Sequence, residues 1–495
     1  MGKLTIHTED GARTVGFDGS PLVSEVLEQA GILFPHPCGG RGVCGKCAVR
    51  LAGAVAEPTT AERKTGLRLA CQSRLLGDTE VWLTLAERTM TQIETDGEEI
   101  AVPLLPMAGK LGAAADIGTT TLALKLFSLA DGKCLATVAG QNPQVSVAAD
   151  VMGRIGAALD GQGLLLQTQI QKALRELLGS ACREAGADAQ DVRSLVLTCN
   201  TTMLYLLTGR NPESLSHAPF EADTLFGVTA NVLGREAYLP PCMNAFVGAD
   251  TTCAVLACGI CEQPETALLC DIGTNGEIAL WKEGKLCVTS TAAGPAFEGA
   301  GISCGVNAVR GAVDRVWVEG GEIRAHTVGE AEPCGVCGSG LMDAVAAYLE
   351  TELIDETGYT EKDELPLCGQ ITLAPKDIRQ VQLAKAAICA GVRTLLHVTK
   401  TDEADVKKVY LAGGFGKHLR AESCAKIGLL PPALARKCEA VGNAALAGAV
   451  RLLLNTEEQA RAAAIARSSE HVNLGGNPVF NQEYIEQMLF PSQEE

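Results

Sequence analysis

The sequence is poor in aromatic residues and in histidine, and it contains no long hydrophobic run. Aromatic residues make up 4% of the chain and its 7 histidines are scattered singly, so a histidine-based metal site is not indicated. No apolar run reaches the about 18 to 20 residues that cross a bilayer. The chain starts without a basic segment followed by an apolar one, so no secretory signal is expected. These absences predict a cytoplasmic protein that does not associate with a membrane.

Basic residues are also in deficit. Lysine and arginine number 41 against 59 aspartate and glutamate residues, which gives a formal net charge of −18. The resulting field repels nucleic acid and acidic membrane surfaces, so no nucleic-acid partner is expected. A chain of 495 residues is longer than one hydrophobic core usually serves, which predicts two or more domains.

Cysteine occurs 20 times, and without an export signal most of these thiols are expected to be reduced and packed in cores. The stretch PHPCGGRGVCGKCAVR is different, because it brings Cys38, Cys44 and Cys47 together, and Cys71 follows in GLRLACQSRL. A close trio with a distant fourth cysteine follows the plant-type [2Fe–2S] pattern, with one extra residue in the first gap, and the glycines suit a loop around a cluster. We predict these four cysteines as cluster ligands. The alternative is a structural zinc site, which prefers two C-x2-C pairs where this stretch has one.

The flanks of this stretch predict a small ferredoxin domain over residues 1–94. KLTIHT and RTVGFDG indicate a hairpin, LVSEVLEQAG indicates a short helix, and TEVWLTL indicates a closing strand. Residues 95–111 mix acids, prolines and glycines in TDGEEIAVPLLPMAGK and are predicted to be a linker.

One motif occurs twice beyond the linker. ADIGTTTLALKLFSLADGKCLATV carries Asp116 and CDIGTNGEIALWKEGKLCVTS carries Asp271, and each copy predicts three strands joined by a D-I-G-T turn and a second tight turn. Such a turn offers N–H groups and hydroxyls to phosphate oxygens, and the aspartate before it can hold a hydrated Mg²⁺ or orient water. An aspartate that opens a tight turn is often only a cap, but the duplication favours two lobes that grip a polyphosphate. We therefore predict Asp116 and Asp271 as catalytic residues and the following as nucleotide-binding: Gly118, Thr119, Thr120, Thr121, Gly273, Thr274, Asn275, Gly276 and Glu277.

A glycine-rich stretch supplies the third part of a nucleotide cleft. In VKKVYLAGGFGKHL an apolar strand runs into Gly413, Gly414, Phe415 and Gly416. Paired glycines between a strand and a helix allow a flat base to lie against bare backbone. These four residues are predicted to bind the nucleotide as well.

The three parts, in this order, resemble the superfamily of ATPases that includes acetate kinase, sugar kinases, Hsp70 and actin. Its phosphate loops match residues 116–121 and 271–277, its adenosine motif matches 411–416, and NAFVGADTT and VGNAALAGAV are similar to its two interlobe helices. The resemblance implies ATP with Mg²⁺ as cofactor and two ATPase lobes, at 112–245 and 246–495. The expected fold class is a multidomain α/β and α+β chain: an N-terminal β-grasp [2Fe–2S] ferredoxin domain followed by a two-lobed, ribonuclease H-like ATPase.

The order of ferredoxin, linker and ATPase lobes resembles the reductive activators of corrinoid proteins. CNTTMLYLLTG, AGPAFEGAGISCG, CGSGLMDAVA and FNQEYIEQMLF are also similar to that family, so the resemblance covers nearly the whole chain. It implies that ATP drives one electron from a [2Fe–2S] cluster onto a Co(II) corrinoid protein, which regenerates Co(I) for methyl transfer. It also implies an upstream low-potential electron donor and a homodimer.

Two other functions stay open on the sequence. A small-molecule kinase would use Asp271 as a base toward a sugar or an acid, although phosphoryl transfer needs no redox centre. A chaperone-like module would use ATP to grip a partner, although a loop that exposes cysteines favours electron exchange.

Two further groups of cysteines are interpreted as structural. Cys334 and Cys337 are expected in a glycine turn before a helix at 339–352, with Ser339 available as its cap. The three cysteines of TTCAVLACGICEQ are expected to pack in a core, because their spacing is helical and the segment is rich in alanine.

Overall fold

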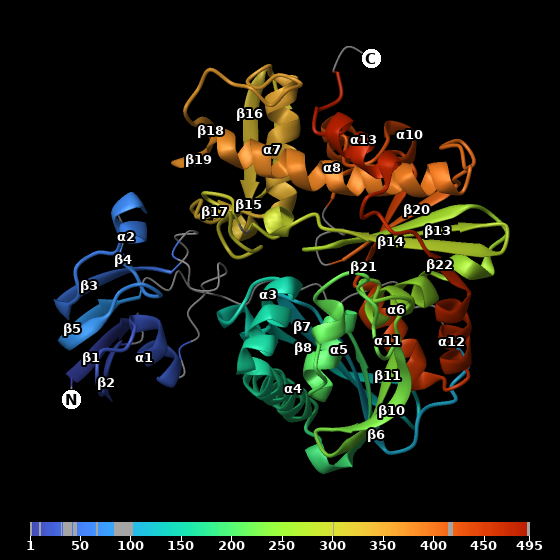
Figure 1. Ribbon diagram of the computed structural model, residues 1–495, viewed down its shortest axis with the longest axis horizontal. Helices are drawn as coiled ribbons and strands as arrows, with labels where there is room; N and C mark the ends of the chain where they lie inside the picture. Colours follow the sequence, from blue (N-terminus) through green and yellow to red (C-terminus); the bar gives the residue numbers. More distant parts are fainter. Residues whose placement is uncertain are drawn as a thin grey trace.

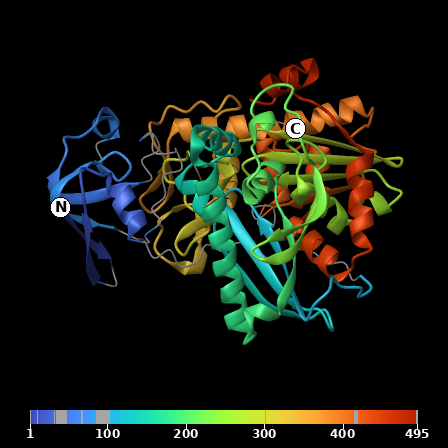
Figure 2. The same cartoon turned by 60° about the horizontal axis from the view of Figure 1, so that its bottom comes forward.

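The computed structural model of the chain describes residues 2–8, 11–30, 32, 42, 47–65, 68–83, 102–299, 301–413 and 419–492. A small N-terminal unit lies at one end of a larger two-lobed body (Figure 1). Figure 2 shows the same separation from a second direction. The predicted site residues Cys38, Cys44, Gly414, Phe415 and Gly416 lie outside the described residues.

The N-terminal unit is a mixed sheet in the order β2-β1-β5-β3-β4. Its elements are β1 (Gly2–Thr8), β2 (Gly11–Phe17), α1 (Val23–Gln29), β3 (Ala48–Val55), α2 (Thr60–Thr65), β4 (Arg68–Leu69) and β5 (Leu75–Trp82). The two central strands β1 and β5 run parallel, while the outer pairs are antiparallel, which is a β-grasp arrangement. Its hydrophobic core consists of residues of this unit, among them Leu4, Ile6 and Val81.

The first lobe is built on a sheet in the order β10-β11-β9-β6-β7-β8. Its elements are β6 (Leu111–Ile117), β7 (Thr121–Ser128), β8 (Cys134–Gln141), α3 (Val151–Ala157), α4 (Gly163–Ala185), β9 (Val192–Thr198), α5 (Thr201–Thr208), β10 (Phe226–Val232) and β11 (Arg235–Pro241). Helix α4 covers β7 and β8, because Leu166, Ile170 and Leu174 recur at helical spacing and are buried on that face.

The second lobe is built on a sheet in the order β21-β20-β12-β13-β14-β22. Its strands and helices are β12 (Ala267–Ile272), β13 (Gly276–Lys282), β14 (Lys285–Thr291), β15 (Ala312–Glu319), β16 (Glu322–Thr327), β17 (Gly335–Val336), α7 (Gly338–Glu350), β18 (Leu365–Cys368), β19 (Ile371–Leu373), α8 (Pro375–Val398), β20 (Lys408–Ala412), α9 (Ala421–Ile427), α10 (Pro432–Ala435), β21 (Cys438–Gly442), β22 (Ser469–His471) and α13 (Pro478–Glu486). Helix α8 is long and apolar enough to cross a membrane, but 78% of its apolar window is buried inside the protein. It packs on β13, β14 and α13, so it is a core helix.

The two large sheets share one plan, as the repeated motif predicts. Strands β6 and β12 are each antiparallel to the next strand of their hairpin and parallel to a later strand, β9 or β20. The backbone N–H of Asn142 donates to the Thr120 carbonyl and that of Gly294 donates to the Thr274 carbonyl, both at 2.9 Å. In both copies, therefore, the chain that follows the third strand donates a backbone hydrogen bond to the turn, although the accepting residue is the fifth from Asp116 in the first copy and the fourth from Asp271 in the second.

Helices α6 (Ala249–Cys258) and α11 (Ala444–Leu454) lie between the two sheets (Figure 1). The two helices approach each other closely at Gly448. A Cβ on this residue would lie 2.0 Å from the Cys253 carbonyl oxygen, so only glycine fits there. Helix α11 packs on β6 and β9, and α12 (Glu458–Ser468) packs on β11, although both follow second-lobe strands in the sequence. The chain thus returns to the first sheet after completing most of the second.

The end of the predicted linker lies against this returning segment. The backbone N–H of Leu105 donates to the Leu454 carbonyl at 2.9 Å, and that of Met107 donates to the Leu453 carbonyl at 3.0 Å. Met107 is also buried. Residues 102–110 are therefore part of the folded body, whereas residues 84–101 lie outside the described residues.

Candidate nucleotide cleft and iron–sulfur site

A cavity of about 260 Å³ lies where parallel strands of both large sheets end. Asp116 and Asp271 lie at the ends of β6 and β12, and Asn200, Gly413 and Asn443 follow β9, β20 and β21. All five line the cavity. Open α/β sheets bind ligands at the carboxyl ends of their strands, and here two such edges face each other.

Both D-I-G-T turns face this cavity. The predicted residues that line it are Asp116, Gly118, Thr119, Thr120, Thr121, Asp271, Gly273, Thr274, Asn275, Glu277 and Gly413. A Cβ on Gly118 would lie 2.8 Å from the Thr121 carbonyl oxygen. A Cβ on Gly413, whose φ is +98°, would lie 2.8 Å from Asp271 Oδ1. Gly276 instead starts β13 and packs against Thr291 and Ile388.

Four partly buried carboxyl groups share the cavity. Burial raises the pKa of Asp116 to about 7, while a 2.9 Å hydrogen bond from Asn443 Nδ2 opposes the shift. Burial also raises the pKa of Asp271 to about 7, and repulsion from Asp250 and Asp116 adds to this. Burial raises the pKa of Asp250 to about 6 and that of Glu277 well above its ordinary value. This much buried negative charge favours a bound cation.

The cavity fits a cation that arrives with a nucleotide. Within the described residues, no group of three or more His, Cys, Asp or Glu side chains is placed to hold a metal ion by itself. Mg²⁺ usually keeps several waters and binds through one or two carboxylates together with substrate phosphates. The arrangement therefore suits Mg²⁺ shared between the protein and phosphate oxygens.

A glutamate that the sequence reasoning did not single out joins the two turns. Glu298 ends the short helical turn η6 (Pro295–Glu298) and lines the cavity. Its Oε2 accepts a hydrogen bond from Thr120 Oγ1 and its Oε1 accepts one from Thr274 Oγ1, both at 2.6 Å. One carboxylate thus contacts the phosphate turns of both lobes.

A buried arginine lies behind the first turn. Arg154 on α3 donates hydrogen bonds to the Thr119 carbonyl oxygen and, at 3.0 Å, to Gln144 Oε1. Burial lowers the pKa of Arg154 to about 9, and the charges of Asp150 and Glu298 oppose the shift. The sequence gives no local signal for this residue, because a single arginine in a short helix is mostly exposed, and nothing in VMGRIGA indicates that this one is buried.

Asn200 and Asn443 were also missed by the sequence reasoning. Asn200 Nδ2 donates to Thr119 Oγ1 at 3.2 Å, and Asn443 Nδ2 contacts Asp116. Both side chains also cap the helices that follow them, α5 and α11. A signal was present, because each is a polar residue placed just after an apolar strand, as Asp116 and Asp271 are placed near the ends of theirs.

The structural interpretation of the remaining cysteine groups is partly confirmed. Cys253 on α6 is buried in a core, and Cys258 and Cys261 pack against one. Cys337 precedes α7 as expected, but it lines the cavity together with Ser339. The expected capping role of Ser339 is wrong, since its hydroxyl donates to the Asp314 carbonyl at 3.0 Å.

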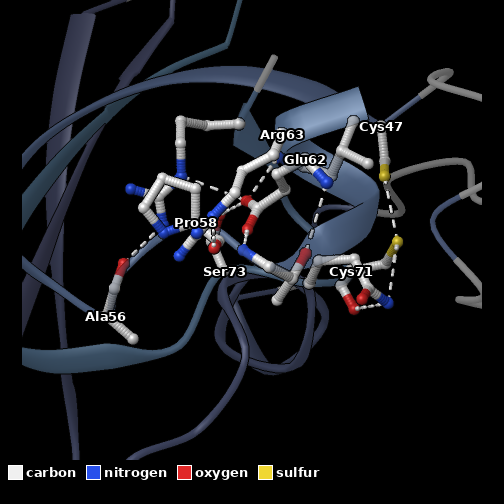
Figure 3. Close-up of polar contacts among 11 residues, drawn as sticks. Cys47, Ala56, Pro58, Glu62, Arg63, Cys71 and Ser73 are labelled. Atoms are coloured by element: carbon white, nitrogen blue, oxygen red, sulfur yellow. Dashed lines mark hydrogen bonds and ion pairs between the residues drawn. The ribbon is translucent and has the colours of Figure 1, made fainter. Parts of the chain in front are cut away.

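Two of the four predicted cluster ligands lie within the described residues, and they meet. Cys47 precedes β3 and Cys71 follows β4; their Sγ atoms are 3.2 Å apart and both residues are buried (Figure 3). The hydrogen bond from Cys47 lowers the pKa of Cys71 to about 7, although burial opposes the shift. A lowered thiol pKa favours the thiolate that binds iron. This converging pair fits a [2Fe–2S] cluster.

A buried glutamate fixes the segment that carries Cys71. Oε1 of Glu62 accepts hydrogen bonds from Ser73 Oγ at 2.6 Å, Leu69 N at 3.0 Å and Arg68 Nε at 3.1 Å (Figure 3). Burial by itself would raise the pKa of Glu62, but these hydrogen bonds and one from the start of α2 outweigh it and lower the pKa to about 2. The carboxylate thereby ties α2 to both sides of Cys71.

Known protein families match three consecutive parts of the chain. The 2Fe-2S iron-sulfur cluster binding domain matches residues 7–76, the RACo middle region matches 111–263, and the C-terminal domain of RACo, the ASKHA domain, matches 265–495. The corrinoid activation enzyme RamQ of Eubacterium limosum is 33% identical over 418 residues, which cover 77% of this chain and 70% of that protein. The chain belongs to the RACo family of corrinoid activators.

Two further similar proteins support this family membership. The [Co(II) methylated amine-specific corrinoid protein] reductase of Methanosarcina barkeri is 27% identical over 77% of each chain. The solved structure of a reductive activator for corrinoid, iron-sulfur protein is 27% identical, with a TM-score of 0.73 over 100% of this chain and 99% of that one. Membership in the RACo family confirms the predicted fold class, a [2Fe–2S] ferredoxin domain followed by an ASKHA ATPase, and with it the [2Fe–2S] cluster and ATP with Mg²⁺ as cofactors.

Proposed function

We propose that this RACo-family enzyme performs the ATP-dependent reductive activation of a corrinoid protein, with Cys38, Cys44, Cys47 and Cys71 as ligands of its cluster. When bound, the cluster supplies the single electron that converts Co(II) of the partner to Co(I), the form that accepts methyl groups. The observation that carries the proposal is that one chain holds both a converging, buried Cys47–Cys71 pair and a two-sided phosphate cleft.

Within the cleft, the two D-I-G-T turns bind the nucleotide phosphates from opposite sides. The hydroxyls and N–H groups of 118–121 and 273–275 donate to phosphate oxygens from opposite lobes. Asp116 and Asp271 hold or orient the water shell of Mg²⁺, and their buried negative charge is offset when the cation binds. Gly413, with Gly414, Phe415 and Gly416, takes the adenosine.

The energy required lies within reach of a closing cleft. A plant-type cluster has a reduction potential of about −400 mV. Lifting one electron by a further 100 to 200 mV costs about 2 to 5 kcal/mol, and differential ligand binding can shift two conformations by about that much. ATP thus acts as a conformational lever, and no phosphoryl group passes to a small substrate.

The remaining assignments belong to the same proposal. The names of the relatives support a corrinoid protein as electron acceptor; a low-potential donor reloads the cluster, and two copies of the chain form the working unit. The proposed division of the chain is a ferredoxin domain at 1–94, a linker at 95–111 whose residues from 102 onward pack on the body, and lobes at 112–245 and 246–495. The separate core of the N-terminal unit supports the first of these boundaries.

A spectroscopic assay tests this function. The purified protein is mixed with a Co(II) corrinoid protein, a chemical reductant and ATP, and visible absorption is followed for Co(I). Co(I) that forms only with ATP is the expected result. ATP turnover that depends on a sugar or an acid would favour a kinase, and ATP binding without redox change on any corrinoid partner would favour a chaperone-like module.

Two substitutions separate the two sites. Cys47→Ser should remove most of the visible absorption of the cluster and leave nucleotide affinity unchanged, whereas the exposed Cys134→Ser should change neither. Asp271→Asn should keep the chromophore and abolish the ATP dependence of Co(II) reduction, with the exposed Asp363→Asn as control. ATP-driven reduction that survives in Asp271→Asn would contradict the assignment of the second turn.

A further inference from the structure

We infer that Glu298 is a positioning residue of the nucleotide cleft: its carboxylate holds the two phosphate turns together and releases both hydroxyls when nucleotide phosphates bind them. The inference rests on the proposed ATP site. It assigns a role to a charged residue from neither D-I-G-T motif, in the stretch AGPAFEGAGISCG.

The geometry points to competition with phosphate. The two oxygens of Glu298 each take one hydroxyl, from Thr120 in the first lobe and from Thr274 in the second, both at 2.6 Å. These hydroxyls belong to the groups that the repeated motif offers to phosphate oxygens. A hydroxyl has a single proton to donate, so it cannot serve the carboxylate and a phosphate oxygen at once. Phosphate binding therefore requires an exchange at both turns.

The position of Glu298 is fixed by its backbone. Gly294 and Gly299, with φ of +79° and +75°, bound the η6 turn, and Gly294 N is bonded to the Thr274 carbonyl. Phe297 is buried, and η6 packs on α7 and α8. The backbone that carries the carboxylate is therefore fixed, so the carboxylate leaves the two hydroxyls either by rotation of its own side chain or by a movement of η6 against these two helices.

Charge gives the exchange its direction. A nucleotide brings negative phosphates toward the Glu298 carboxylate, and like charges in a buried site repel strongly. Arg154 lies behind the first turn, buried and bonded to the Thr119 carbonyl, so a cation stays in place to attract phosphate when Glu298 withdraws. Phosphate occupancy thereby breaks both hydrogen bonds of the Glu298 carboxylate, and with them its link between the turns of the two lobes.

Removing the charge should therefore favour nucleotide binding. In the full-length protein, Glu298→Gln and Glu298→Ala should bind MgATP and MgADP about tenfold more tightly by titration calorimetry, since hydrogen bonds to a charged group no longer have to be broken. The affinity for adenosine, which lacks phosphates, should stay unchanged. The exposed Glu361→Gln is the matched control and should behave as wild type.

Hydrogen–deuterium exchange tests the bridge without nucleotide. Peptides that cover the two turns should exchange several times faster in Glu298→Ala than in wild type or Glu361→Gln, and MgATP should restore their protection. Unchanged or weaker MgATP affinity in Glu298→Gln, with a lower rate of hydrolysis, would overturn the inference and make Glu298 a residue that acts on the attacking water. If the wild-type protein binds no MgATP, the proposed ATP site is wrong. Independently of that result, unchanged exchange of the two turns in Glu298→Ala would show that Glu298 does not hold them together.

Discussion

Glu62 is buried and Asp271 is partly buried, and their surroundings move the pKa values of the two carboxyl groups in opposite directions. Glu62 is surrounded by donors, so its pKa falls to about 2. Desolvation raises the pKa of Asp271 to about 7, and repulsion from Asp250 and Asp116 adds to the shift. Hydrogen bonds within the fold stabilise the charged form of Glu62. The charged form of Asp271 lacks such stabilisation, and a bound cation would supply it. The difference separates a structural carboxylate from a binding one.

At the residue scale, Glu62→Gln should destabilise the N-terminal unit at pH 7 by about 2 to 3 kcal/mol, because an amide cannot accept the same hydrogen bonds. The pKa of Glu62 lies at about 2 in the fold against an ordinary value of 4.5, so the carboxylate stabilises the fold above pH 4.5 and this contribution is lost as the pH falls toward 2. Denaturant unfolding followed by circular dichroism at several pH values measures both effects.

The control for this prediction is Glu57→Gln, which changes an exposed glutamate just before α2. It should leave stability unchanged at every pH. Wild type should lose about 1 kcal/mol more than Glu62→Gln between pH 7 and pH 3.5. Equal losses in both proteins would mean that the Glu62 network does not hold the carboxylate in its charged form.

At the scale of elements, the crossing of α6 and α11 joins the lobes. The contact depends on Gly448, and the first residue before α11, Asn443, reaches Asp116 in the cleft. A shift of α11 is therefore transmitted to the first phosphate turn. The same helix covers β6 and β9, so one element both contacts α6 and forms part of the wall of the first lobe.

Gly448→Ala should accordingly destabilise the two-lobed body by about 1 to 3 kcal/mol, because its Cβ would meet the Cys253 backbone and force the helices apart. The affinity for MgATP should fall as well, since Asn443 moves with α11. Gly156→Ala on α3 is the control: its Cβ meets nothing within 4 Å, so stability should be unchanged or rise slightly. Denaturant unfolding measures the stability and titration calorimetry measures the affinity for MgATP. A Gly448→Ala protein with wild-type stability and affinity would contradict the close crossing of α6 and α11.

At the scale of the whole molecule, the chain consists of a small unit with its own core and a body in which one core combines residues of both lobes. The core of the N-terminal unit draws on residues of that unit, whereas another core combines Phe127 of β7 with Leu446 of α11 and Ala462 of α12. The body should therefore unfold as one cooperative unit, and the N-terminal unit should unfold separately.

Scanning calorimetry of the full chain tests this division. MgATP at about 100 times its dissociation constant should stabilise only the transition of the body, by about 2.7 kcal/mol. Cys47→Ser should lower only the transition of the N-terminal unit, which bleaching of the visible absorption identifies in wild type. A single transition that moves with both perturbations would show that the two parts are coupled without nucleotide.

The sequence by itself determined the features that are local in the chain. The spacing of Cys38, Cys44 and Cys47 predicts a cluster, because the ligands of a loop must be close in sequence. The two D-I-G-T hairpins predict their own turns, because hydrogen bonds within a hairpin involve neighbouring residues. Asp116 and Asp271 could be recognised for the same reason, each at the end of an apolar strand.

The tertiary structure alone decided which distant residues share the cleft. Glu298 reaches Thr120 only because the two D-I-G-T hairpins face each other, and Asn443 reaches Asp116 only because α11 returns to the first sheet. Gly276, part of the same motif as its neighbours, packs against α8 instead of lining the cavity. Such contacts depend on how whole sheets and helices pack, and the packing is set by buried surfaces summed over the lobes rather than by any short stretch of residues.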